Sequence, residues 1–284
     1  MEQNNIGIFL IIVLFHPNEA DLRYFEQLGQ VYSGYIIDNS EEAAAGFSPG
    51  KLEYICNHKN LGIAEAQNIG MHKALNNPAF THVVFFDQDT RIDNSYPAII
   101  VSEFIAIHQT FPNLAVLGPT VKHLGSGEEY KSVIHKDHFI GNRFIQRREV
   151  ISSGCCISRE NLERIGLNDS RLFIDFVDFE WCWRAEHAGY LCGITTEVHI
   201  LHKVGRRELR FPFGYRVIIS APVRYYYQYR NFLWLFRKKY VPWRWKIATG
   251  VKYLAHLLYF PLFVHGGSER ASYMLKGIKA GLKK

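Results

Sequence analysis

Short apolar runs alternate with amphipathic stretches through the first two thirds of the chain. The runs are bounded by polar residues, as buried strands are. Between them, apolar residues recur every three or four positions, as on a helix packed along one side. This alternation predicts an α/β fold whose mixed, mostly parallel sheet carries helices on both faces. The expected strands are 8–15, 34–37, 54–57, 83–86, 115–117, 150–157 and 194–201, and the expected helices are 19–30, 63–75, 99–109, 158–165 and 179–187.

The C-terminal part of the chain has a different composition. Residues 201–284 contain 18 Lys and Arg against 2 Asp and Glu, whereas residues 1–200 contain 15 against 25. From about residue 220 the chain reads as helical, aromatic and basic, and residues 251–264 are apolar but too few to span a bilayer. This pattern is typical of a helix at a membrane surface. A helical lid or a dimer face is the structural alternative, and nucleic acid binding is not expected.

The 284 residues are enough to bury a large core. The five cysteines are odd in number and lack CxxC spacing, which argues against a disulfide framework or a zinc ribbon and favours a reducing cytoplasm. The first apolar run is too short to span a membrane, and no basic segment precedes it as in a signal peptide. We therefore expect it to be the first strand of the sheet.

The apolar run 83–86 ends in two acids, Asp87 and Asp89. Side chains alternate along an extended chain, so the two carboxylates should point one way and Gln88 the other. Two carboxylates suit a hard divalent cation that carries phosphate oxygens, and α/β sheets bind ligands at the carboxyl ends of their strands. We expect an enzyme acting on a nucleoside diphosphate compound. The structural alternative is a strand-end pair that caps a loop.

A series of motifs extends this expectation. The order of the motifs resembles the family 2 glycosyltransferases of the GT-A fold, most closely their bacterial rhamnosyltransferase branch, over the first 205 residues. The motifs are FHPN (15–18), IIDNS (36–40), NLGIAEAQNIG (60–70), FFDQDT (85–90), SSG (152–154), FIDFVDFEWCWRAEHAGY (173–190) and HKVG (202–205). The resemblance implies a GT-A catalytic domain over 1–215, with a nucleotide-sugar half to about 120 and an acceptor half after it. Residues 216–284 are then a helical, membrane-associating region.

The resemblance also implies roles for individual residues in donor binding. Asp38 would accept from a pyrimidine base, although an Asx-turn is the structural alternative. The metal, Mg²⁺ or Mn²⁺, would be held by Asp89 and Asp87 with His202. The nucleotide-sugar contacts implied in this way are Phe15, His16, Asp38, Asn39, Asn60, Asn68, Asp87, Gln88 and Asp89.

Asp178 stands where the family places its catalytic base, although many members have Glu-Asp where this chain has Val177-Asp178. The structural alternative is that Asp178 caps the helix that follows. Glu180 and Arg184 are four residues apart and are expected to form a helical ion pair. Acceptor or other contacts are expected from Ser153, Gly154, Trp181, Arg224 and Arg230, with core packing as the alternative for Trp181. Arg224, Arg230 and Asn231 could reach the diphosphate or the acceptor, and a basic membrane-facing surface is the alternative for them.

By resemblance, the reaction is an inverting, metal-dependent transfer of L-rhamnose from dTDP-L-rhamnose. The acceptor would be a lipid-linked glycan of cell-surface polysaccharide synthesis, at the inner leaflet of the cell membrane, and the enzyme would be cytoplasmic. A UDP-hexose or UDP-galactofuranose donor is the alternative within the family. The DQDT sequence also matches haloacid-dehalogenase-type phosphatases, with Asp87 as nucleophile and Asp89 as acid, and a non-catalytic scaffold is a third class.

Overall fold

The computed structural model of the chain describes residues 6–123, 138–140, 143–202, 208–210 and 216–283. For residues 123, 138–139, 201–202, 208–210 and 216–218 the description covers the backbone alone.

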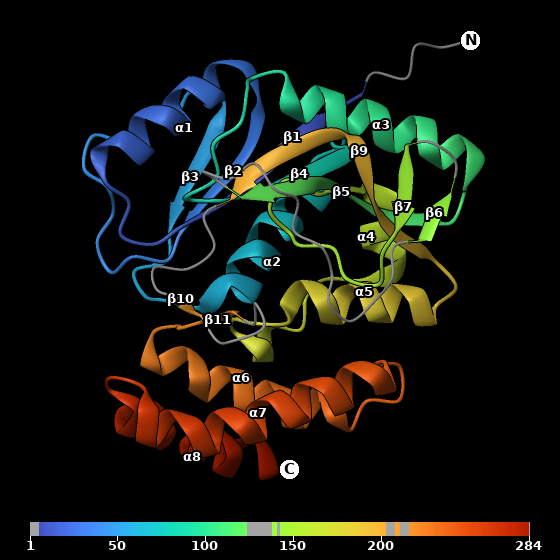
Figure 1. Cartoon of the computed structure of the whole chain (residues 1–284). Helices are drawn as coiled ribbons and strands as arrows, with labels where there is room; N and C mark the ends of the chain where they lie inside the picture. Colours follow the sequence, from blue (N-terminus) through green and yellow to red (C-terminus); the bar gives the residue numbers. More distant parts are fainter. Residues whose placement is uncertain (1–5, 124–137, 141–142, 203–207, 211–215, 284) are drawn as a thin grey trace.

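Within this described part, a nine-stranded sheet forms the centre of the molecule (Figure 1). Strands β8 and β7 run against their neighbours, and the other strands share one direction. The sheet is therefore mixed and mostly parallel, as expected. Across the sheet the strands are β3 (Leu52–Cys56), β2 (Ser33–Asp38), β1 (Ile8–Leu14), β4 (His82–Asp87), β8 (Cys156–Ser158), β5 (Leu114–His123), β9 (Leu191–His202), β7 (Phe144–Gln146) and β6 (His138–Ile140). A separate pair, β10 (Glu208–Arg210) and β11 (Arg216–Ile218), is antiparallel.

Helices cover both faces of the sheet because the central strands are apolar on both sides. In β1, Leu10 and Ile12 pack with helices α1 (Glu19–Val31) and α3 (Tyr96–Thr110). Phe9 and Ile11 lie on the other face, with helices α2 (Gly62–Leu75), α4 (Arg159–Ile165) and α5 (Val177–His187). Figure 1 shows these helices above and below the sheet. The expected α/β fold, with helices on both faces of the sheet, is confirmed.

One expected element is wrong. The run 150–157 is not a strand throughout, because only Cys156–Ser158 pairs with the sheet. Residues 152–155 form a turn in which the Cys155 N–H donates to the Ser152 carbonyl at 3.0 Å. Gly154 takes a φ of +80° in this turn, and a Cβ there would lie 2.6 Å from the Tyr96 hydroxyl. The turn brings Ser152 and Ser153 to the end of β4.

Three further helices form a layer below α5 in Figure 1: α6 (Pro222–Phe236), α7 (Trp243–Phe263) and α8 (Gly267–Leu282). Part of their contact with α5 is aromatic, since the Trp245 ring of α7 lies 4.7 Å from the Trp183 ring of α5. No helix in the described part of the chain is both long and apolar enough to cross a membrane. The division of the chain at residues 215 and 216 stays a prediction.

Candidate active site

Asp87 ends β4, and the chain turns there instead of continuing as an extended strand. The Thr90 N–H donates to the Asp87 carbonyl at 3.0 Å, which closes a turn over residues 87–90. The argument from strand alternation is therefore wrong for Asp89. The two carboxylates are nevertheless close in electrostatic terms. Burial, followed by the charges of Asp89 and Asp178, raises the pKa of Asp87 to about 7.

Gln88 ties this turn to the first strand and the first helix. Its Oε1 accepts from the Phe15 N–H at 2.8 Å, and its Nε2 donates to Asp21 at 2.9 Å. Asp21 also pairs with Arg91, whose guanidinium donates to the Gln88 carbonyl at 2.7 Å. We call residues 87–90 the DxD turn. Both side-chain polar atoms of Gln88 thus fix the DxD turn against β1 and α1. Its contact with the donor stays a prediction.

The Ser153-Gly154 turn supports the DxD turn from the other side. The hydroxyls of Ser153 and Thr90 are 2.6 Å apart, and the Asp87 N–H points to the Ser153 hydroxyl at 3.5 Å. The Gly154 N–H donates to the Phe85 carbonyl at 2.7 Å. Ser153 is buried. Ser153 therefore positions Asp87 in this structure. Its contact with the acceptor stays a prediction.

Asp38 lies fully buried at the end of β2. One carboxylate oxygen accepts from the Ser40 N–H at 2.9 Å and from the Ser40 hydroxyl at 2.5 Å. The other oxygen accepts from the Tyr54 hydroxyl at 2.7 Å. This is the Asx-turn that the sequence offered as the alternative. Recognition of a base by Asp38 stays a prediction.

Polar residues from neighbouring loops gather beside Asp38. The Asn39 amide donates to the Gly62 carbonyl at 3.1 Å, and Asn60 accepts from the Gly62 N–H at 2.9 Å. His16 lies 3.2 Å from Glu41, and the exposed Phe15 ring lies 4.1 Å from the His16 ring. The carboxyl ends of β1, β2 and β4 therefore carry most of the expected donor contacts on one edge of the sheet.

Asn68 makes its hydrogen bonds away from the carboxyl ends of β1, β2 and β4. Its amide N–H donates to the Asn168 carbonyl at 3.0 Å, and its carbonyl oxygen accepts from the Asn168 N–H at 2.9 Å. This reciprocal pair joins α2 to the loop that precedes α5. Both polar atoms of Asn68 are used in the protein, and its predicted donor contact has no support from this geometry.

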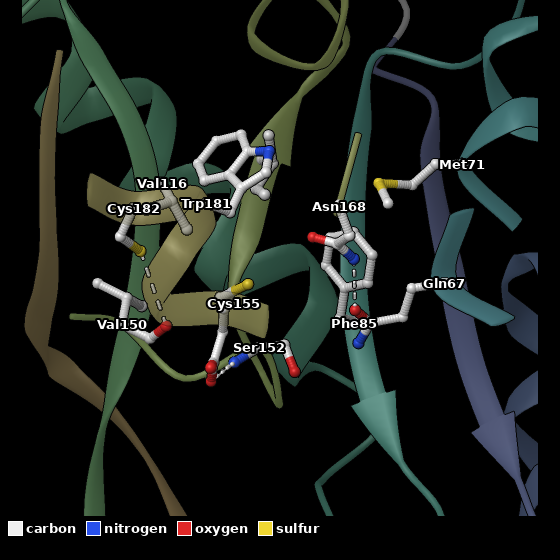
Figure 2. Close-up of a pocket in the computed structure, with 12 residues that line it drawn as sticks. Gln67, Met71, Phe85, Val116, Val150, Ser152, Cys155, Asn168, Trp181 and Cys182 are labelled. Carbon is white, nitrogen blue, oxygen red and sulfur yellow. Dashed lines mark hydrogen bonds between the residues drawn. The ribbon is translucent and has the colours of Figure 1, made fainter. Parts of the chain in front are cut away.

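Asp178 lies in the first turn of α5. It accepts from the Ser152 N–H at 3.3 Å and from the Phe179 N–H at 3.0 Å. The N-cap of α5 is Phe176, and no side chain caps it by a hydrogen bond, so Asp178 does not take the capping role offered as the alternative. Burial raises its pKa to about 6. Asp178 lines a cavity of about 30 Å³, room for about one water, together with Ser152, Trp181 and Cys155, which Figure 2 shows. The Trp181 ring N–H donates to the Gly166 carbonyl at 2.7 Å, so this side chain belongs to the core.

The backbone that leads into Asp178 is strained. Phe173, Asp175 and Phe176 all have positive φ values, between 66° and 67°, and such non-glycine residues cost of the order of 1–3 kcal/mol each. We call residues 171–176 the base loop. Strain of this kind persists only where the surrounding structure over-determines the conformation.

Helix α6 supplies that support through Asn231, which the sequence placed near the diphosphate or the acceptor and not against this loop. The Asn231 amide, fully buried, donates to the carbonyls of Leu172, Ile174 and Asp175 at 2.8, 2.8 and 3.1 Å. The Arg230 guanidinium donates to the Arg171 and Leu172 carbonyls at 2.7 and 3.0 Å.

Arg224 completes the support with an ion pair to Asp175. Arg224 and Arg230, expected near the acceptor, thus contact the base loop. Glu180 and Arg184 form the expected ion pair at 3.1 Å.

The metal site is only partly visible. Among the described side chains, no three His, Cys, Asp or Glu residues converge as a metal would require. The backbone of His202 ends β9, beside His123 of β5, but its side chain lies outside the described residues. The carboxylates of Asp87 and Asp89 repel each other, and carboxylate oxygens are the ligands that a hard divalent cation takes. The chemistry of this pair therefore fits such a cation.

Comparisons with known proteins extend these observations. No family model matches the chain. The dTDP-rhamnosyl transferase RfbF of Shigella flexneri is 30% identical over 293 residues, which cover 98% of this chain and 95% of that protein. The low-salt glycan biosynthesis hexosyltransferase Agl10 of Haloferax volcanii is 21% identical over 240 residues, covering 79% of this chain and 76% of that protein.

Solved structures share the fold. GalNAc-T7 with UDP, GalNAc and Mn²⁺ superposes with a TM-score of 0.56 at 13% identity, covering 100% of this chain and 57% of that one. S. aureus TarS 1-349 in complex with UDP-GlcNAc gives 0.55 at 11% identity, covering 97% and 81%. The phosphatase alternative fails because the relative matched over 98% of the chain is a rhamnosyl transferase. The DQDT sequence lies at the end of β4. Matched over nearly its whole length to a rhamnosyl transferase, the chain is an enzyme that belongs to the family 2 glycosyltransferases of the GT-A fold, most like the bacterial rhamnosyltransferases.

Proposed function

We propose that the protein transfers L-rhamnose from dTDP-L-rhamnose to a lipid-linked glycan, with inversion, in cell-surface polysaccharide synthesis. The donor is proposed because the relative matched over nearly the whole chain is named a dTDP-rhamnosyl transferase. The observation that carries the chemistry is the group of Asp87, Asp89 and Asp178, in which Asp87 and Asp178 have raised pKa values. A UDP-hexose donor is the second candidate, since the other relative is named a hexosyltransferase. UDP-galactofuranose is a further alternative.

Asp178 is the proposed general base. Its carboxylate takes the proton of the acceptor hydroxyl as that oxygen attacks the anomeric carbon of the donor sugar. The bond from that carbon to the diphosphate breaks in the same displacement, which inverts the anomeric centre without a covalent sugar–enzyme intermediate. A base works best when its pKa lies near the operating pH. Burial raises the pKa of Asp178 to about 6, which meets this condition.

Asp89 and Asp87 are the proposed ligands of Mg²⁺ or Mn²⁺, with His202 as a third. Support comes from the chemistry of the pair, because carboxylate oxygens are ligands that these cations prefer. Burial beside two other acids also leaves Asp87 with uncompensated charge. When bound, a divalent cation would offset the charge that develops on the departing diphosphate. In this proposal the edge formed by Phe15, Asp38 and the asparagines near it receives the nucleotide.

The acceptor and its location are proposed from the C-terminal region. The basic, aromatic helices after residue 220 suit the inner, cytoplasmic face of a membrane, where lipid-linked glycans present a sugar near anionic headgroups. The acceptor then approaches on the side of the base loop, which α6 contacts directly.

The testing experiment is a donor panel. Nucleotide release is measured from dTDP-rhamnose, UDP-hexoses and UDP-galactofuranose with Mn²⁺, Mg²⁺ or chelator, and donor binding is measured by calorimetry in the same samples. We expect metal-dependent binding and release with dTDP-rhamnose. Release from a UDP-sugar alone would change the proposed donor to that sugar nucleotide. The proposed function would be refuted if no donor were bound and none released its nucleotide.

A further inference from the structure

The outward face of helix α7 is apolar along its whole length. Seven large apolar side chains on this helix are between 58% and 75% exposed, and all of them except Phe263 lie on one side. These six recur every three or four residues, so they fall within about 100° of arc on a helix of 3.6 residues per turn. We call them the α7 stripe: Trp243, Ile247, Val251, Leu254, Leu258 and Leu262.

The stripe is not the packing face of the helix. Trp245, Thr249, Tyr253 and Phe260 are buried, and on the same helical wheel they lie roughly opposite the stripe. Trp245 contacts Trp183 and Phe176, and the Tyr253 ring stacks on Tyr229 at 4.5 Å. Helix α7 is therefore fixed to the protein by one apolar face and presents a second apolar face outward. Scattered exposed apolar residues are ordinary on a protein surface, but a continuous band marks an interaction site.

The charge around the stripe decides what covers it. Helices α6 and α7 contain no acidic residue. On α7, Arg244 lies at the edge of the stripe, Lys252 is exposed farther round the helix, and α8 adds the exposed Lys276 and Lys279. A second copy of this chain docked through the stripe would bring these like charges together, which is unfavourable. An anionic lipid surface would attract them.

We infer that the α7 stripe lies flat in the headgroup region of an anionic phospholipid bilayer. The stripe runs about 28 Å along the helix, at 1.5 Å per residue, and Trp243 at its first turn suits the membrane–water boundary. The inference deepens the proposed function and rests on it only for the lipid-linked nature of the acceptor. The opposite side of the same helix contacts Phe176 of the base loop, so docking would place the catalytic side of the protein toward the membrane.

The test is flotation of the full-length protein with vesicles, measured without donor. The vesicles are phosphatidylcholine alone or phosphatidylcholine with one third phosphatidylglycerol. The variant is Leu254→Gln with Leu258→Gln, because glutamine keeps helix propensity while removing apolar surface. The matched control is Val31→Gln with Ile99→Gln, which changes two exposed apolar residues on α1 and α3.

We expect the wild type and the control to float with the anionic vesicles, less so with phosphatidylcholine alone or at high salt. The stripe variant should lose about tenfold or more of this partitioning, since each leucine loses most of its transfer free energy, with an unchanged thermal midpoint. Equal flotation of variant and control would overturn the inference. The inference would also be overturned if sedimentation showed a dimer that forms whether or not vesicles are present and that dissociates in the stripe variant. Because no donor is present, either failure leaves the donor-panel result intact.

Discussion

Replacing Asn231 by alanine should displace Asp178, the proposed catalytic base, while leaving the protein folded. The Asn231 amide is the buried donor to three carbonyls of the base loop, and losing these bonds should cost about 2–3 kcal/mol at about 1 kcal/mol each. The strain of the three left-handed residues, of the order of 1–3 kcal/mol each, is then no longer offset by these hydrogen bonds. The loop should relax, and Asp178, two residues beyond it, should move with it.

The assay separates binding from chemistry. A displacement near 1 Å lowers a rate by about 100-fold, so we expect kcat to fall by about that factor while the donor dissociation constant is retained. The acid limb of the pH–rate profile should also move to lower pH, because burial is what raises the pKa of Asp178 and a loosened loop admits water. If Asn231 served stability alone, its replacement would change neither kcat per folded molecule nor the acid limb of the pH–rate profile.

The matched control is Tyr229→Phe on the same helix. It removes one buried hydrogen bond, from the Tyr229 hydroxyl to the Tyr253 carbonyl at 2.6 Å, without touching the base loop. It should lower stability by about 1 kcal/mol and leave kcat unchanged. If both variants lost activity in proportion to stability, the reasoning about the loop would be refuted.

Three further predictions concern the acids. Asp178→Asn should abolish transfer while calorimetry still detects donor binding; collapse of binding would show a structural role. Asp89→Ala should lose the Mn²⁺ dependence of donor binding, and an unchanged metal response would rule out a ligand role. Because the pKa of Asp87 rises from 3.8 to about 7, the folded protein binds the extra proton and loses stability as pH rises through that window. Asp87→Asn should therefore raise the thermal midpoint of the metal-free protein at about pH 8 but not at about pH 4, and equal shifts in calorimetry would contradict this.

Local pattern predicted much of the fold because strands and helices leave periodic signals. The apolar runs became β1, β2 and β4 in register, and the helix expected over 158–165 forms as α4, with Ser158 as its N-cap. The exception, the expected strand 150–157, contains a glycine at positive φ, and the turn at 152–155 is stabilised by contacts with residues far away in sequence. Periodicity carries no information about such contacts.

The candidate site was predicted less completely for the same physical reason. Asp87 and Asp178 were found from motif and position, but the positioning roles of the residues around them were not. Asn231 lies 56 to 59 residues from the carbonyls it contacts, and nothing in its local sequence indicates a partner. Three left-handed residues without a glycine among them are likewise invisible in the sequence. Support for a strained loop is a tertiary property, so only the structure reveals it.

The repulsion among the three acids links donor binding to the activity of the base. Asp178 contributes to the raised pKa of Asp87, and Coulombic interaction is mutual, so a cation held near Asp87 and Asp89 should lower the pKa of Asp178 as well. The acid limb of kcat reports the loaded enzyme, whereas that of kcat/KM reports the free enzyme. With Mn²⁺ bound only alongside the donor, the limb of kcat should therefore lie at lower pH than that of kcat/KM. Coincident limbs would mean that Asp178 does not sense the charge at the DxD turn, and the base would then be ionised independently of the donor.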